Sequence, residues 1–91
     1  MPERPRWSVI IKRQAGRTLR RLPKDLATRL TAAIDALAEN PRPAGCIKLT
    51  GFDNFWRIRV GGWRIVYAIH DDELIVLVIE IEPRGGAYRN L

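Results

Sequence analysis

The sequence is poor in the residues that build disulfide frameworks and metal centres. Its 91 residues include one cysteine, Cys46, and one histidine, His70. A single cysteine rules out an internal disulfide and fits the reducing environment of the cytosol. A structural zinc site uses about four cysteine or histidine ligands, so we expect no metal ion and no other cofactor. We interpret Cys46 as a small loop residue and His70 as a solvated turn residue.

Long hydrophobic stretches are also missing. The longest aliphatic run, Leu74–Ile79, is far shorter than the ~20 residues of a membrane-spanning helix. The first six residues lack the apolar stretch of a secretory signal. We therefore expect a soluble, cytoplasmic protein that does not contact a membrane. A length of 91 residues fits one domain covering residues 1–91 and excludes a cofactor-binding domain joined to a substrate domain.

Lysine is scarce, although the chain is strongly basic. The formal net charge is +6, and the 16 basic residues comprise 13 arginines and 3 lysines. Arginine carries a planar fork of donors that matches phosphate, so the composition favours a polyanionic partner such as nucleic acid. An acidic protein is the alternative partner. Hydrophobic residues make up 46% of the chain, which is typical of a globular protein and not of a disordered one.

The order of hydrophobic patterns predicts an α+β fold, in which an N-terminal strand and a two-helix hairpin pack with an antiparallel sheet. Residues Trp7–Ile11 are rich in strand formers. Residues Lys12–Leu22 have the period of an amphipathic helix, and its Arg13 and Arg17 belong either to a nucleic-acid contact or to a solvated face. Pro23 starts a second helix, which continues to Asn40 before two prolines stop it.

A tight hairpin follows, with strands Phe55–Val60 and Trp63–Ile69 on either side of Gly61-Gly62. This turn sets the register, so that Arg59 faces Arg64. Side chains alternate along each strand and directly opposed residues share a face. The face that the helices cover should hold Trp56, Ile58, Val60, Trp63, Ile65, Tyr67 and Ile69. The opposite face should hold Phe55, Arg57, Arg59, Arg64, Val66 and Ala68.

Three arginines, Arg57, Arg59 and Arg64, should therefore converge on the sheet face away from the core. Directly opposed like charges destabilise a sheet, and such uncompensated costs occur chiefly at functional sites. We interpret the trio as a phosphate cradle in preference to a solvated face, because the arginines converge instead of alternating with acids. A third strand, Glu73–Ile81, has aliphatic residues on both faces, so the C-terminal tail or a partner should cover one of them.

These elements resemble the RelE/ParE superfamily of type II toxins over nearly the whole chain. The resemblance rests on Arg21-Leu22-Pro23, on Lys48-Leu49-Thr50-Gly51, on the block from Phe55 to Tyr67, and on a terminal Arg84 and Tyr88. The long block matches the family's aromatic–basic–x–basic–x–Gly–x–aromatic–Arg–x–x–Tyr pattern. The resemblance implies two helices packed on an antiparallel sheet, as in microbial ribonucleases.

For the RelE branch, the resemblance further implies a toxin that cleaves mRNA in the ribosomal A site without a metal ion. The ribose 2′-hydroxyl attacks the adjacent phosphorus. Matched position by position, the catalytic residues are Arg59, Arg64, Arg84 and Tyr88. Residues matched or expected to contact RNA are Lys48, Arg57, Arg13 and Arg17. Lys48 is equally consistent with a plain solvated lysine.

The implied partners are a cognate antitoxin, the ribosome and its mRNA, and operator DNA bound through the antitoxin. Two alternatives stay open on the sequence alone. One is a ParE-like inhibitor of DNA gyrase, which acts by binding, and the other is an inactive relative that only binds antitoxin. Retention of all five matched cleft residues, the three arginines of the cradle together with Arg84 and Tyr88, favours cleavage.

Overall fold

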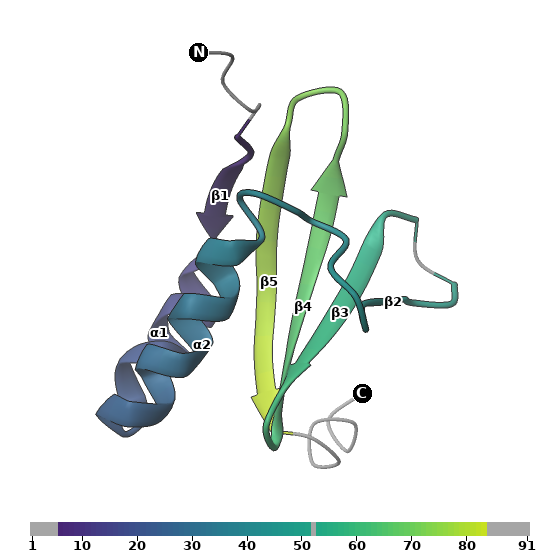
Figure 1. Ribbon diagram of the computed structural model, residues 1–91. Coiled ribbons are helices and arrows are strands. Elements are labelled where there is room, and N and C mark those ends of the chain that lie inside the picture. The colour runs from purple at the N-terminus through teal and green to yellow at the C-terminus, as the bar shows by residue number, and fades with distance from the viewer. Residues whose placement is uncertain (1–5, 52, 84–91) are drawn as a thin grey trace.

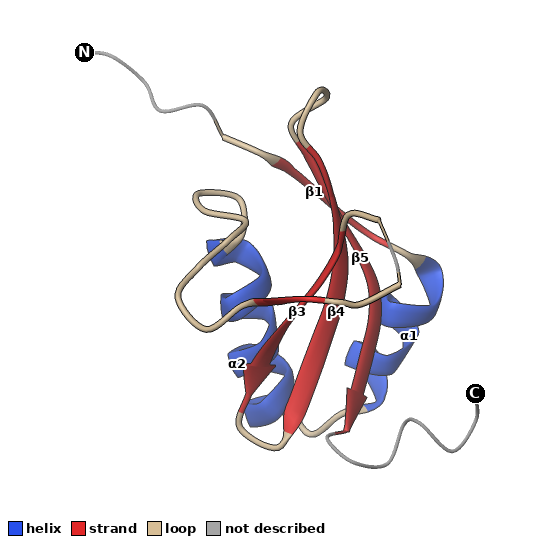
Figure 2. Ribbon diagram, turned by 90° about the vertical axis from the view of Figure 1, so that its right-hand side faces the viewer, coloured by secondary structure: helices blue, strands red, loops and turns tan. Residues whose placement is uncertain are grey.

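A five-stranded sheet with two helices on one face forms the structure, a computed structural model that describes residues 6–51 and 53–83 (Figure 1). The elements follow in the order β1 (Ser8–Ile11), α1 (Arg13–Arg21), α2 (Lys24–Ala36), β2 (Ile47–Lys48), β3 (Phe55–Val60), β4 (Trp63–His70) and β5 (Ile75–Pro83). Both helices lie on the same side of the sheet (Figures 1 and 2). The predicted α+β fold is confirmed.

The sheet is mixed, with the strand order β1-β5-β4-β3-β2. The predicted antiparallel pairing is confirmed for β2 to β5. The N-terminal strand β1 adds a parallel edge, where Ser8 pairs with Ile75 and Ile11 with Val78. This pairing joins the first strand of the chain to the last one. The two helices connect β1, at one edge of the sheet, to β2, at the other edge.

Proline explains the break between the helices. Leu22 is extended, with φ −85° and ψ 154°, as expected of a residue that precedes proline. The second helix ends at Ala36, four residues before the predicted end at Asn40. The chain there tightens into turns, in which the Leu37 amide donates to the Ile34 carbonyl at 3.0 Å, a common way to satisfy the last carbonyls of a helix. Neither helix in the described ranges is long and apolar enough to cross a membrane.

The hydrophobic core lies between the helices and the covered face of the sheet. Its fully buried side chains include Tyr67, Ile65 and Ile69 of β4 and Leu30 and Ile34 of α2. Tyr67 is also tied to the loop after α2, because its hydroxyl donates to the Pro41 carbonyl at 2.6 Å. Burial raises the pKa of the Tyr67 phenol above its ordinary value.

We expect Tyr67→Phe to lower the free energy of unfolding by about 1–2 kcal/mol, because the Pro41 carbonyl loses its buried donor. In the wild type, the raised pKa keeps the folded phenol protonated while the unfolded one ionises near its ordinary value of about 10. The stabilisation is therefore present below that pH and is lost as the pH rises above it. Urea unfolding at neutral and alkaline pH tests both points. A variant with unchanged stability and an unchanged alkaline profile would contradict them.

Candidate functional site

The β3–β4 hairpin has the register that the two-glycine turn predicts. Arg59 pairs with Arg64, Arg57 with Val66 and Val60 with Trp63. The turn depends on Gly61, which has a φ of 60°, a left-handed conformation that glycine adopts without strain. The turn and register therefore fix which side chains share the face away from the helices.

We call the side of β3, β4 and β5 that faces away from the helices the arginine face. Its members on β3 and β4 are Phe55, Arg57, Arg59, Arg64, Val66 and Ala68, as predicted. Two cross-strand rows matter for chemistry. One row runs from Arg59 through Arg64 to Glu82, and the other runs from Arg57 through Val66 to Glu80. Figure 2 shows that the helices lie on the other side of these strands.

A β-bulge in β5 brings the two acids onto the arginine face. Tyr67 pairs with Val78, whereas its neighbour Val66 pairs with Glu80, so Ile79 is the extra residue. The bulge shifts the alternation by one residue, which keeps Val76, Val78 and Ile81 in the core. The interpretation that the arginines converge without alternating acids is therefore wrong, because three arginines share their face with two glutamates.

Arg64 is buried and is not an exposed wall of a cradle. It is 8% exposed, as is Glu82, and its Nη1 lies 3.9 Å from Glu82 Oε2. Arg59 is exposed and Arg57 is partly buried. Burial raises the pKa of the Glu82 carboxyl above its ordinary value, and the neighbouring Glu80 carboxylate adds to the increase, whereas Arg64 opposes it. The site is thus an exposed cation beside a buried ion pair.

The other predicted RNA-binding residues lie apart from this cluster. Lys48 is exposed and pairs with Trp56, which places it on the helix-covered side, whereas Ile47 pairs with Arg57. Arg13 and Arg17 are exposed on α1, in the layer behind the sheet. There they line an open pocket of about 380 Å³ with Gln14, Thr18 and Arg21. Arg13, Arg17 and Arg21 therefore form a second basic surface on α1, and neither this surface nor Lys48 extends the arginine face.

The remaining predicted catalytic residues, Arg84 and Tyr88, lie outside the described residues. The strand β5 ends at Pro83, and Glu82 pairs with Arg64. Arg84 therefore follows directly after the strand that contributes Glu80 and Glu82. Its role and that of Tyr88 stay predictions.

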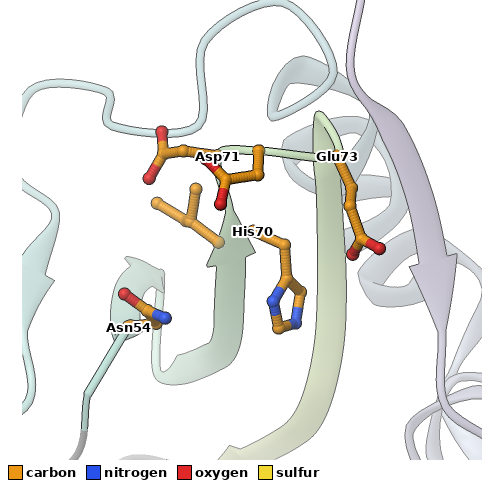
Figure 3. Close-up of a pocket in the computed structure, with 6 residues that line it drawn as sticks. Asn54, His70, Asp71 and Glu73 are labelled. Atoms are coloured by element: carbon orange, nitrogen blue, oxygen red, sulfur yellow. The ribbon is translucent and has the colours of Figure 1, made fainter.

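A second polar site lies at the opposite end of β4 from Arg64. A pocket of about 380 Å³ is lined there by Asn54, Ile69, His70, Asp71, Asp72 and Glu73 (Figure 3). His70 ends β4 and is partly buried, so it is less solvated than predicted. Despite the acids, the described residues include no group of three His, Cys, Asp or Glu side chains that could hold a metal ion.

Arg42 clamps the loop after α2 onto this end of the sheet. Its Nη2 lies 3.0 Å from Asp71 Oδ2, and its guanidinium carbon lies 5.0 Å from the centre of the Trp56 ring. The hydrogen bond from Arg42 lowers the pKa of the Asp71 carboxyl. The Tyr67 hydroxyl also binds the Pro41 carbonyl in the same loop. We therefore interpret the Arg42 contacts as structural, because they fix this loop to the sheet.

Sequence reasoning missed Glu80, Glu82 and Arg42. The alternation of Glu80 and Glu82 with Ile79 and Ile81 was a visible pattern, but it gives the correct face only once the bulge is known. Arg42 lies in a proline-rich loop, where no periodicity indicates a partner. Its pairing with Asp71 spans 29 residues and depends on the tertiary fold.

One family model and two relatives match most of this chain. The family model described as the ParE toxin of type II toxin-antitoxin system, parDE, matches residues 9–88. The putative toxin RelE1 of Methanocaldococcus jannaschii is 30% identical over 88 residues, which cover 93% of this chain and 98% of the relative. Toxin RelE of Mycobacterium tuberculosis is 32% identical over 84 residues, which cover 91% of this chain and 87% of the relative.

Solved structures of similar shape include two RelE toxins. The RelE chain in the archaeal RelE–RelB complex from Pyrococcus horikoshii superposes with a TM-score of 0.79 at 29% identity, covering 89% of this chain and 98% of that one. The isolated Escherichia coli RelE toxin gives a TM-score of 0.76 at 22% identity, covering 92% of this chain and 90% of that one. At that identity, the second likeness supports the fold alone.

Proposed function

The chain belongs to the RelE/ParE superfamily of type II toxins, and from this premise we propose that it is an endoribonuclease that cleaves mRNA in the ribosomal A site. The observation that supports the proposal is the placement of Arg57, Arg59 and Arg64 on one sheet face, on adjacent strands. Two like charges directly opposite each other, such as Arg59 and Arg64, destabilise a sheet. A phosphate between them would turn that repulsion into attraction.

The proposed reaction is an attack of the ribose 2′-oxygen on the adjacent phosphorus. The 2′-hydroxyl proton leaves as the new P–O bond forms, and the bond to the 5′-oxygen breaks as that oxygen takes up a proton from water. The products are a 2′,3′-cyclic phosphate and a 5′-hydroxyl end, with no metal ion required. Negative charge grows on the non-bridging oxygens in the transition state, where preorganised cations give the largest catalytic contribution. Arg59, Arg64 and Arg84 are proposed for that role.

Proton transfer is assigned to Tyr88. Arginine stays protonated in proteins, so Arg57 and Arg59 stabilise charge without exchanging protons. A tyrosine has an ordinary pKa of about 10, which neighbouring guanidinium groups lower. We propose that Tyr88 accepts the 2′-hydroxyl proton and that the ribosome positions the mRNA, which offsets the scarcity of acid–base groups.

The partners follow from the same proposal. We propose a cognate antitoxin that covers the arginine face, since the P. horikoshii relative was solved as a complex of RelE with RelB. The toxin–antitoxin complex would bind operator DNA through the antitoxin. Because its proposed targets are ribosomes and mRNA, we propose that the toxin acts in the cytoplasm. The excess of arginine over acid on this face, three side chains against two, fits an acidic or amphipathic antitoxin segment.

Primer extension on an mRNA after addition of the protein, with and without programmed ribosomes, tests the function. We expect cuts within the A-site codon that appear only when ribosomes are present. The family description names ParE, so a gyrase inhibitor is the second candidate. Absence of cuts together with inhibition of gyrase supercoiling would move the protein to that class and make its arginines a binding surface.

A further inference from the structure

Arg64 has a buried partner on the arginine face before any substrate arrives. Arg64 and Glu82 are directly opposed on β4 and β5, and both are 8% exposed. The distance of 3.9 Å between Nη1 and Oε2 exceeds hydrogen-bond length, so charge attraction is the main interaction between these two atoms. A buried guanidinium without an anion nearby is strongly unfavourable. Glu82 therefore helps to offset the cost of burying Arg64.

We propose that Glu82 is an internal counter-ion that an RNA phosphate replaces beside Arg64, so that Glu82 sets the affinity of the arginine face for phosphodiesters. This inference rests on the proposed function, because it takes Arg64 as a phosphate ligand. The carboxylate and the phosphate compete for the same guanidinium. Substrate binding then exchanges one anion for another and does not leave a buried cation unpaired at any stage.

The surroundings of Glu82 give the exchange a pH dependence. Within residues 6–51 and 53–83, the charged groups that share its face are Arg64 on β4, Arg59 and Arg57 on β3, and Glu80 on its own strand. The described part of β1 contributes the uncharged Ser8 and Ile10 to this side of the sheet. Burial and Glu80 raise the pKa of Glu82. Glu82 therefore takes up a proton at a higher pH than an exposed glutamate does, and Arg64 loses its competing anion as the pH falls.

Glu82→Gln and Glu80→Gln form a matched pair for the test. Each removes one negative charge from the same strand and face, but only Glu82 faces Arg64, whereas Glu80 is exposed and faces Val66. The probe is a short 2′-O-methyl RNA, which keeps the phosphodiesters and lacks the attacking hydroxyl. Fluorescence anisotropy with the full-length wild type, both variants and Arg64→Ala gives the dissociation constants between pH 5 and 8 at fixed ionic strength.

At neutral pH we expect Glu82→Gln to bind about tenfold more tightly than the wild type, and Glu80→Gln about twofold. The wild-type affinity should rise as the pH falls towards 5, whereas that of Glu82→Gln stays nearly constant. A merely structural role for Glu82 would lower stability without increasing affinity. The wild-type pH profile tests the inference even if Glu82→Gln folds poorly.

Two failures are distinguishable. If Arg64→Ala weakens binding while Glu82→Gln and Glu80→Gln behave alike and the wild-type profile is flat, the counter-ion inference is wrong and the proposed function survives. If Arg64→Ala binds the RNA as tightly as the wild type, Arg64 is not a phosphate ligand, and both the inference and the proposed cradle are refuted.

Discussion

Arg64→Ala is expected to lower the rate of ribosome-dependent mRNA cleavage by about 10²–10³-fold, the usual cost of removing one preorganised group that stabilises transition-state charge. Arg64 is preorganised in two ways. The central strand β4 fixes its backbone between β3 and β5, and its side chain is buried, with 8% exposure. Such a side chain needs little reordering when negative charge develops on the phosphorane.

Single-turnover primer extension on programmed ribosomes measures this rate. Arg20→Ala, at an exposed position on α1, is the control and should cleave at the wild-type rate. Because Arg64→Ala leaves the Glu82 carboxylate buried without its cation, the double variant Arg64→Ala/Glu82→Gln separates catalysis from folding. It should recover stability in urea without recovering cleavage, and both variants should still bind the antitoxin.

Arg64→Lys sharpens the interpretation. It keeps the charge beside Glu82 but loses the planar fork that contacts phosphate through two donors. Stability should stay close to wild type, and cleavage should lie between wild type and Arg64→Ala. Unchanged toxicity and cleavage in Arg64→Ala would contradict the ribonuclease mechanism.

The β3–β4 hairpin was predictable because local chemistry determines it. Two glycines between strand-forming runs leave few turn geometries, and the turn then sets every cross-strand pair down to Phe55 and Ala68. The break between the helices was equally local, since Pro23 acts on its immediate neighbour Leu22. Where one residue type restricts the backbone, the sequence was sufficient to predict the local structure.

The composition of the arginine face was only half predictable, because the rest depends on tertiary pairing. The strand β5 is aliphatic at both parities from Ile75 to Ile79, so its alternation cannot indicate the bulge at Ile79. That one residue decides whether Glu80 and Glu82 face the helices or the arginines. Lys48 illustrates the same limit. A strand of two residues is too short to show an alternation of polar and apolar side chains, so the face on which Lys48 lies is known only from its pairing with Trp56.

The two basic surfaces lead to the second prediction. Reversing the charges of Arg57 and Arg59 together to glutamate should weaken RNA binding by about 10³-fold at low salt, because two phosphate contacts become repulsions. Stability should not fall, since Arg59 directly opposes Arg64 and a glutamate there removes a like-charge pair. Loss of RNA binding without loss of stability would show that the opposed arginines serve RNA binding and not the stability of the sheet.

Salt titration of the dissociation constant distinguishes a specific site from general attraction. For single-stranded RNA, two lost contacts reduce the slope of log K against log salt by roughly 1.4. Arg20→Glu/Lys24→Glu changes the net charge equally on the exposed surface of the helices and should cost about tenfold or less. Equal losses of RNA affinity in both double variants would mean that net charge alone attracts RNA. The arginine face would then not be a specific phosphate-binding site.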